Sequence, residues 1–309
     1  MDKLTIRTDK RAIPIIKFSF TGKLLIFALA TLQLAGCVKD DLYNTPHPDK
    51  GAVRITTDWS AASSDAVLPQ SYILRIGTEE QTVTGTSNAF NALFEPGRQD
   101  LLVCHGADGI TLSGHTATVN TLADGTLEPM PGYLFSGTKS LEIVKDDTLR
   151  VTVNMEQRIR RLTLVLKLTP GDEDRISTTS ATLTGIASAI ALRDGTITAT
   201  VGKTVAPIFS IGTYSSDIRS AEAPALVATL RLLGVMPAEH QTLTLAITLT
   251  DGYVHTVTTD LSEVLRNFNT GAGMEPLVLD ATLELPTAGD FHGTISGWEQ
   301  CNDLIIDAH

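Results

Sequence analysis

The sequence predicts an all-β protein built from two tandem antiparallel β-sandwiches. Apolar and polar residues alternate with a period of two along most of the chain, which is the pattern of half-buried strands. Asp-Gly and Pro-Gly pairs separate these segments and mark turns. Helical spacing recurs in one short segment, and no strand–helix–strand rhythm indicates a parallel sheet. Together these observations favour sandwiches over any α/β fold.

The first 36 residues precede every segment with a strand pattern. Six basic residues lie before Leu24, and the apolar stretch from Leu24 to Ala35 follows them. This order is typical of a signal peptide. The stretch is 12 residues long, whereas a membrane-spanning helix needs about 20. We therefore expect residues 1–36 to be removed rather than to span a membrane.

The residues Leu34-Ala35-Gly36-Cys37 resemble the lipobox of bacterial lipoproteins. Cleavage before the cysteine would leave Cys37 as an acylated, diacylglycerol-modified N-terminus, and two or more lipid chains hold a protein stably on a bilayer. Lys39, Asp40 and Asp41 follow and resemble the signal that exports many Bacteroidetes lipoproteins to the cell surface. We expect a lipid anchor in the outer membrane that faces the exterior.

The charge of the mature chain argues against nucleic acid as a partner. The leader holds six of the 24 basic and two of the 35 acidic residues, which leaves 18 against 33 and a formal charge of −15. A polyanion of this kind is repelled by phosphate backbones and anionic head groups.

Two further cysteines, Cys104 and Cys301, could pair in an oxidising compartment. Separate buried thiols are favoured, because the two lie in segments assigned to different domains and nothing in the sequence fixes their separation.

The residues that could act in catalysis or bind a metal do not match the spacing of any known catalytic or metal-binding motif. The seven histidines lack metal-ligand spacing, and no nucleophile elbow is present. Gly171-Asp172-Glu173-Asp174 could bind calcium, but an acidic turn is favoured because no alternating ligands follow. We expect no enzymatic activity, no catalytic residue, no cofactor and no metal site.

The first half of the folded chain follows a polar tether at 37–50. A type II turn is predicted at Glu95-Pro96-Gly97, because proline presets the first central residue and glycine accepts a positive φ at the second. Strands are predicted at 53–59, 72–76, 81–86, 101–104, 140–144 and 149–155.

The basic segment from Gln157 to Arg161 interrupts the alternation, and we place a domain boundary there. Arg158, Arg160 and Arg161 could contact lipid head groups or a partner; an interdomain joint paired to nearby acids is favoured. The predicted domains are 51–159 and 160–309.

The second half continues the strand pattern, most clearly at 241–250, where Asp251-Gly252 turns the chain into 253–259. Leu261, Val264, Leu265 and Phe268 recur at helical spacing, with Asp260 or Ser262 as cap and Gly271 as stop. This predicts a short amphipathic helix. The other predicted strands are 162–168, 180–192, 197–201, 207–212, 225–233, 276–285 and 291–298.

The order of these features resembles the Bacteroidetes fimbrillin superfamily, and within it the lipid-anchored fimbrium anchoring subunits. The matching segments are the lipobox at 34–37, AVRITTDW at 52–59, LFEPGRQDLLVCH at 93–105, RVTVNMEQRIRRLTLVLKL at 150–168, LTLAITLTDGYVHTVTTDL at 243–261 and FHGTISGWEQ at 291–300. They extend over nearly the whole mature chain.

The resemblance implies transthyretin-like sandwiches and fimbrial subunits as partners, joined by strand addition, in which an incoming strand pairs with an open sheet edge. Stalk subunits of the family are trimmed after arginine or lysine, and Lys50 and Arg54 are the candidate cleavage sites here. Anchoring subunits keep their lipid. The anchor role is favoured, because the export signal is close to Cys37 and few residues follow Trp298, although Leu304, Ile305 and Ile306 could form a short donor strand.

A surface glycan-binding lipoprotein is the alternative. Sugar sites usually present exposed aromatic rings. Aromatic residues make up 5% of this chain, and alternation places Trp59 and Trp298 on buried faces.

Overall fold

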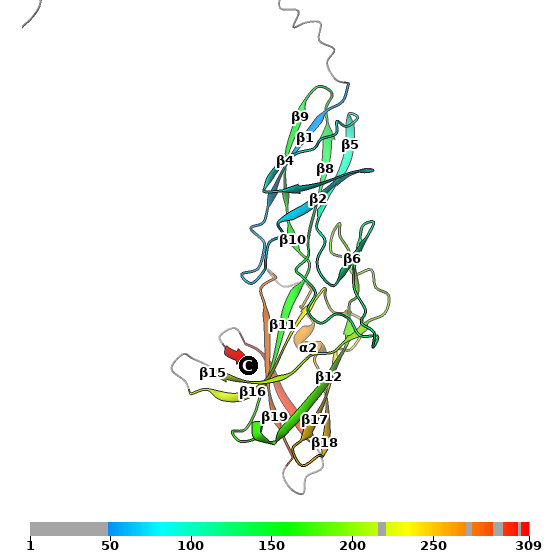
Figure 1. Cartoon of the computed structure of the whole chain (residues 1–309). Helices are drawn as coiled ribbons and strands as arrows, with labels where there is room; N and C mark the ends of the chain where they lie inside the picture. The colour runs from blue at the N-terminus through cyan, green and yellow to red at the C-terminus, as the bar shows by residue number, and fades with distance from the viewer. Residues whose placement is uncertain (1–48, 216–220, 270–273, 287–292, 302–303, 309) are drawn as a thin grey trace, which may run out of the picture. The chain divides into compact units, whose positions relative to one another are not determined.

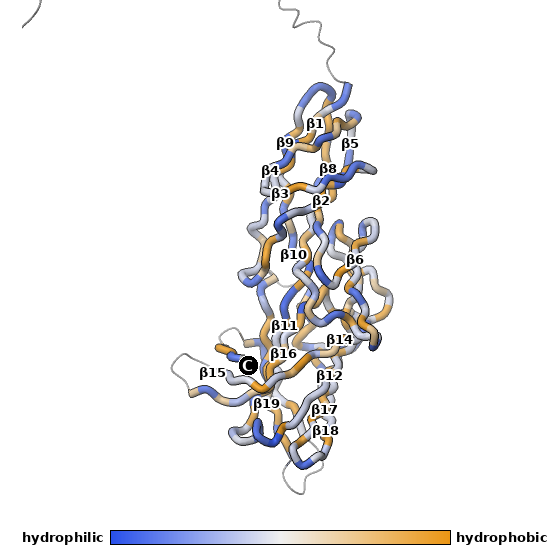
Figure 2. The backbone as a smooth tube through the Cα atoms, in the orientation of Figure 1, coloured by the Kyte–Doolittle hydropathy of each residue, from blue (hydrophilic) through white to orange (hydrophobic). Residues whose placement is uncertain are grey.

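The computed structural model describes residues 49–215, 221–269, 274–286, 293–301 and 304–308. In this part of the chain nearly all regular structure is strand, arranged in five sheets (Figure 1). The all-β class predicted from the alternation is confirmed. Figure 2 shows why, because hydrophobic and hydrophilic residues alternate along the strands.

The first half forms two sheets. One has three strands in the order β4 (Ser87–Ala89), β1 (Ala52–Asp58) and β9 (Thr148–Asn154). The other has five, in the order β10 (Glu156–Gln157), β8 (Phe135–Ile143), β5 (Gly97–Cys104), β2 (Ser71–Ile76) and β3 (Glu79–Thr84). Val53 and Ile55 of the first sheet share one hydrophobic cluster with Leu74 and Leu101 of the second.

The second half repeats this plan with larger sheets. Six strands follow the order β20 (Thr294–Gln300), β19 (Leu277–Glu284), β11 (Arg160–Lys167), β16 (Ala223–Leu232), β15 (Ser210–Ser215) and β21 (Ile305–Ala308). Four more follow the order β14 (Lys203–Val205), β12 (Ile176–Ile186), β17 (Thr242–Leu249) and β18 (Val254–Asp260).

The predicted hairpin at 241–259 is confirmed. Leu243, Leu245 and Ile247 of β17 are buried, and β17 pairs with β18 in antiparallel register. Gly252 lies in the turn with φ +88°, a conformation that glycine adopts without the strain that a side chain would cause.

Two strand pairs are parallel, which the prediction of purely antiparallel sheets did not include. β1 runs parallel to β9 over seven residue pairs, from Ala52↔Thr148 to Asp58↔Asn154. β11 runs parallel to β19 from Leu162↔Leu277 to Lys167↔Thr282. Parallel strands need long crossovers and leave no local turn signal. The alternation pattern therefore identified these strands but not their direction of pairing.

A small fifth sheet joins the two halves. It contains β6 (Ile110–Ser113), β7 (Thr116–Val119) and β13 (Ala189–Ala191), in the order β13-β7-β6. The β6–β7 hairpin was not predicted, because each of its strands has four residues and so shows only two alternating apolar positions. The strand predicted at 197–201 was wrong: within it, only Ile197 forms an isolated bridge, to Ile190. The domain bounds 51–159 and 160–309 stay a prediction.

The predicted helix is present but short. α2 covers Ser262–Leu265, and Leu261, Leu265 and Phe268 are buried. The predicted cap was wrong: the N-cap residue is Leu261, without a capping side-chain hydrogen bond, although Asp260 accepts a hydrogen bond from the Ser262 backbone N–H at 2.8 Å. The apolar spacing therefore reports a buried turn of helix, and Gly271, the expected stop, lies outside the described residues.

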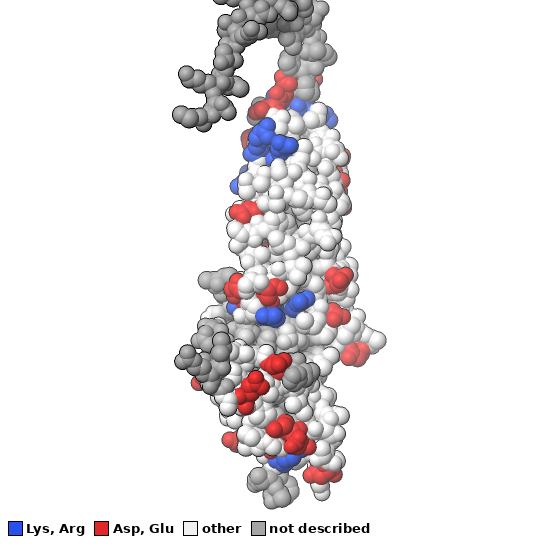
Figure 3. All heavy atoms as spheres, turned by 60° about the vertical axis from the view of Figure 1, so that its left-hand side comes forward, with Lys and Arg blue, Asp and Glu red and all other residues white. Residues whose placement is uncertain are grey.

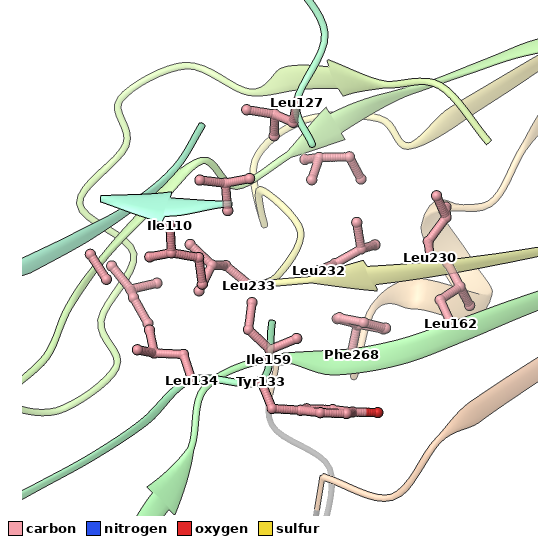
Figure 4. Close-up of a cluster of buried hydrophobic side chains, with 14 of the residues drawn as sticks. Ile110, Leu127, Tyr133, Leu134, Ile159, Leu162, Leu230, Leu232, Leu233 and Phe268 are labelled. Atoms are coloured by element: carbon pink, nitrogen blue, oxygen red, sulfur yellow. The ribbon is translucent and has the colours of Figure 1, made fainter. Parts of the chain in front are cut away.

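Side chains from both halves meet in one cluster (Figure 4). Tyr133, Leu134 and Ile159 converge there with Leu162, Leu230 and Phe268. All six are buried. The hydrophobic core therefore continues across the segment 157–161.

His105 is the buried titratable group at the end of β5. The Phe135 backbone N–H donates to its Nε2 at 3.1 Å, so Nδ1 carries the proton and donates to the Gly106 carbonyl at 2.7 Å. Burial lowers the pKa of His105 below its ordinary 6.5, against a smaller opposing effect of the hydrogen bond to Gly106. The structure thus holds this imidazole neutral.

We predict that the free energy of unfolding decreases as the pH falls from about 7 to about 5. The unfolded chain binds a proton at His105 near pH 6.5, whereas the folded chain binds it only at lower pH, so protonation favours unfolding. Urea unfolding across this range measures the effect. His105→Gln should weaken the dependence, and an unchanged dependence in this variant would contradict the assignment.

Candidate attachment and assembly sites

The predicted lipidation and export residues precede the described part of the chain. Cys37, Lys39, Asp40 and Asp41 lie outside the described residues, which begin at Asp49. Their roles stay predictions. Among the described residues, no helix is both long and apolar enough to cross a membrane.

Lys50 and Arg54, the candidate cleavage sites, lie at the start of the fold. Lys50 Nζ is 3.0 Å from Glu95 Oε1, and the Lys50 carbonyl accepts a backbone hydrogen bond from Asp146 at 3.2 Å. Gly51 exchanges two backbone hydrogen bonds of 2.9 Å with Phe94. The backbone after Lys50 is therefore held on both sides.

Arg54 belongs to the central strand of its sheet. Its side chain is exposed, but in register it pairs with Ala89 of β4 and Arg150 of β9. The neighbouring Val53 and Ile55 are buried in the core. A protease that binds its substrate as an extended strand would first have to pull β1 out of the sheet.

The C-terminal residues that could act as a donor strand occupy an edge of their own chain. β21 pairs antiparallel with β15, from Gly212↔Ala308 to Ser215↔Ile305. Ile306 packs, together with Tyr214 and Val278, against a second buried cluster of Val165, Ala225 and Val227. The edge of β15 is thus covered by a strand of four residues.

Two arginines of the basic segment 157–161 lie in the interior of the protein and have partners there. Arg158 Nε donates to Ser136 Oγ at 2.8 Å, and its NH1 is 2.8 Å from Glu156 Oε2. Arg160 Nε donates to the Glu275 carbonyl at 2.7 Å, and its guanidinium lies 5.5 Å from the Phe268 ring centroid. Both arginines are buried. Their guanidinium groups therefore donate hydrogen bonds to partners within the protein.

Arg161 belongs to a cluster with Asp65, Tyr133 and Arg231 that no local sequence pattern indicated. It lies beside Arg231 in the β11–β16 register, and its Nε is 3.2 Å from Asp65 Oδ2. Arg231 places its guanidinium 4.4 Å from the Tyr133 ring centroid. Tyr133 donates its hydroxyl hydrogen to Asp65. The Asp65 carboxylate therefore contacts Arg161 and Tyr133, and Arg231 joins the cluster through the Tyr133 ring.

Ionisation constants in this cluster follow from its geometry. Burial, and then the hydrogen bond to Asp65, raise the pKa of Tyr133 to about 12. Burial opposes ionisation of Asp65, but hydrogen bonds from Tyr133 and Ser63 and the charge of Arg161 outweigh it and lower the pKa of that carboxyl. These residues come from segments far apart in the sequence, so no local pattern could have brought them together.

The cysteines and the acidic turn form neither a disulfide nor a metal site in the described part of the chain. Cys104 is buried and Cys301 half-buried, and neither forms a disulfide there. Among the described residues, no group of three or more His, Cys, Asp or Glu side chains could hold a metal ion. In the acidic turn, Asp172 pairs with Arg175 at 2.6 Å and Glu173 accepts the Gly171 N–H, so both carboxylates have partners within the protein.

Both tryptophans are half-buried rather than fully buried as alternation predicted. Trp59 donates to Thr57 Oγ1 at 2.9 Å and packs edge-to-face on Tyr72 and Phe135. Trp298 donates to Thr259 Oγ1 at 3.0 Å. Each indole is fixed by a hydrogen bond and by contact with the core.

The sequence matches the model of one protein family. The model of the fimbrillin-A associated anchor proteins Mfa1 and Mfa2 matches residues 47–299. None of the curated proteins matches the sequence.

Solved structures with the same fold come from Porphyromonas and Bacteroides. The fimbrial anchor protein Mfa2 of Porphyromonas gingivalis superimposes with a TM-score of 0.56 at 9% identity, covering 84% of this chain and 100% of its own. A candidate adhesin of Bacteroides thetaiotaomicron gives 0.54 at 14% identity, covering 77% and 93%. One from Bacteroides ovatus gives 0.54 at 12% identity, covering 86% and 97%. At these identities the likeness shows the shared fold.

We predict that Asp65→Asn lowers the free energy of unfolding by about 1–3 kcal/mol, because Arg161, which lies beside Arg231, loses its carboxylate partner and Tyr133 loses a charged hydrogen-bond acceptor. Urea denaturation measures the loss. The matched control is Glu263→Gln, which removes an ion pair to Arg266 whose side chains are 82% and 69% exposed and should cost less than about 0.5 kcal/mol. Equal effects of the two substitutions would contradict the joint role of Asp65.

We also predict that trypsin does not cut the folded protein after Arg54, because β1 is paired on both sides. Mass spectrometry of the fragments identifies the cut sites. Val53→Asp should loosen β1 by burying a charge and make this bond cleavable, and the wild-type chain unfolded in urea should be cut there as well. Cleavage after Arg54 in the native wild-type protein would overturn the prediction.

Proposed function

Because the chain belongs to the family of the fimbrillin-A associated anchor proteins Mfa1 and Mfa2, we propose that it anchors a fimbrium to the cell and takes part in its assembly. The observation that carries this proposal is the extent of the family match, residues 47–299, which includes both halves of the fold. The role is structural and non-enzymatic.

The attachment we propose is lipid on Cys37. The segment from Cys37 to Pro48 is 12 residues long, so fully extended it reaches at most about 40 Å from the lipid to the fold. Lys39, Asp40 and Asp41 act as the export signal that brings the protein to the outer face of the outer membrane. The anchor would then hold its folded part close to the membrane surface.

The partners we propose are other fimbrial subunits, joined by strand addition. A sheet edge with unpaired N–H and C=O groups accepts a further strand, and short edge strands exchange most readily. The contact between β21 and β15 supports this proposal, because β21 covers that edge with four residues. An incoming strand could replace β21 at β15, or β21 could pair with a neighbouring subunit.

We further propose that the anchor keeps its first strand. Lys50 and Arg54 lie in backbone that is paired on both sides, which supports an untrimmed N-terminus. An intact β1 also preserves the covalent path from Cys37 into the core. In this proposal residues 51–159 and 160–309 are the two sandwich domains.

The test replaces Cys37 with alanine. We predict that Cys37→Ala abolishes labelling of the protein by a palmitate analogue, releases it from the outer-membrane fraction and releases the fimbriae from the cells. Fractionation, metabolic labelling and electron microscopy of fimbriae measure these effects. Cys301→Ala, which removes a half-buried free thiol, is the matched control and should leave all three unchanged. Retention of the Cys37→Ala protein and of its fimbriae at the surface would refute the anchor.

A further inference from the structure

A cavity of about 480 Å³ lies on the outer face of the five-stranded sheet. Its walls come from β2, β5 and β8, from the turn between β6 and β7, and from Arg193, which follows β13. Its volume is in the range of small-molecule binding sites. The cavity is therefore large enough for one sugar unit.

Hydrogen bonds between segments distant in sequence fix the walls. Ser136 Oγ donates to the Leu192 carbonyl at 2.6 Å, and Thr138 Oγ1 donates to the Arg193 carbonyl at 3.2 Å. On the opposite side, Arg75 NH1 donates to the Gly114 carbonyl at 2.6 Å. Because each wall is held by the sheet beneath it, the cavity is formed before any ligand binds.

The lining is cationic in an acidic protein. Arg75, Arg98, Lys139 and Arg193 line the cavity, and Asp100 is the acidic residue among them, although the whole chain has a formal charge of −11. In the view of Figure 3, acidic side chains are spread along the face and basic ones gather in a few groups. A local excess of positive charge favours an anionic ligand.

Two of these four cationic side chains, Arg98 and Lys139, have hydrogen-bond donors without a partner among the described residues, whereas Arg75 and Arg193 are paired. Arg75 contacts Glu80 at 2.7 Å, and Arg193 contacts Asp100 at 3.3 Å. Arg98 uses its Nε to reach Ser140 Oγ at 2.9 Å. Within the described residues, the terminal nitrogens of Arg98 and the Lys139 ammonium have no hydrogen-bond or ion-pair partner. A guanidinium fork of this kind binds a planar carboxylate through two parallel hydrogen bonds.

The remaining groups favour a singly charged ligand that carries hydroxyls. Asp100 would repel a doubly charged phosphate but can accept hydrogen bonds from sugar hydroxyls. Ser140 and Thr138 add hydroxyl groups to the same wall, and the buried Leu102 provides an apolar floor. This combination suits the polar edge and the C–H face of a sugar ring.

We propose that this cavity binds the carboxylate of an acidic sugar unit, of the hexuronic acid type, with Arg98 as its principal ligand. The proposal does not depend on lipid attachment or on fimbrial assembly. Because no aromatic ring stacks on the sugar, we expect a dissociation constant on the order of 1 mM.

The experiment measures binding to the whole chain, purified in detergent, by titration calorimetry and by saturation-transfer NMR. The probes are glucuronic acid, glucose as its neutral counterpart, and inorganic phosphate as a small anion. Arg98→Gln removes the proposed carboxylate ligand. Arg150→Gln is the matched control, because Arg150 is also an exposed strand arginine but lies in β9, outside the cavity. Thermal unfolding of both variants confirms that they are folded.

We expect glucuronic acid to bind at least about tenfold more tightly than glucose or phosphate, and Arg98→Gln to weaken this binding at least about tenfold. Arg150→Gln should leave it unchanged. Three results would each overturn the proposal: no glucuronic acid binding by folded wild-type protein, equal binding by Arg98→Gln, or tighter binding of phosphate or glucose than of glucuronic acid.

Discussion

The structure depends on the parallel pairing that places the first strand of each half between two neighbours. β1 lies between β4 and β9, and β11 lies between β16 and β19. In each case the parallel partner comes late in that half of the chain, so the sheet is complete only after its intervening strands have formed. Such non-local pairing makes folding slow and the finished sheet hard to open at one end. Val53 and Ile55 in β1, like Leu162 and Leu164 in β11, anchor these strands in the core.

The segment that follows β9 ties the two halves together by burial of charge. Arg158 and Arg160 lie in the interior with carbonyl, hydroxyl and carboxylate partners, while Arg161 pairs with Asp65 and Arg231 lies over the Tyr133 ring. Removing one member of such a group leaves a charge without its partner in a poorly solvated site, which costs more than the contact itself contributes. The small sheet β13-β7-β6 adds backbone pairing between the halves. Their junction is therefore specified by polar geometry as well as by the apolar cluster of Figure 4.

Patterns local in sequence predicted the local structure. Alternation located β17 and β18, and the apolar spacing of Leu261, Leu265 and Phe268 located the helical turn. The parallel pairs, the small sheet β13-β7-β6 and the cluster of Asp65, Tyr133 and Arg231 were not predicted. Each joins segments whose local sequence does not indicate that they meet. The candidate sites divide in the same way. Cys37 and the export signal proposed at residues 39–41 are contiguous, so a local pattern was enough to suggest them. Arg98 became a candidate only in the folded chain, where Arg193 forms another wall of the same cavity.

The position of β1 also bears on how an anchor would carry load. In the proposed attachment, a pull on the fimbrium is resisted by lipid at Cys37 and reaches the fold through the tether and Gly51. The force then acts along β1, whose seven paired residues resist sliding past β9 together rather than one after another. A strand pulled along its length loads all its hydrogen bonds at once, whereas a strand peeled from its end loads them singly. In the proposed attachment, a tether cut after Arg54 would divide this strand and remove that resistance, so the paired backbone of β1 and a retained lipid would serve the same mechanical role.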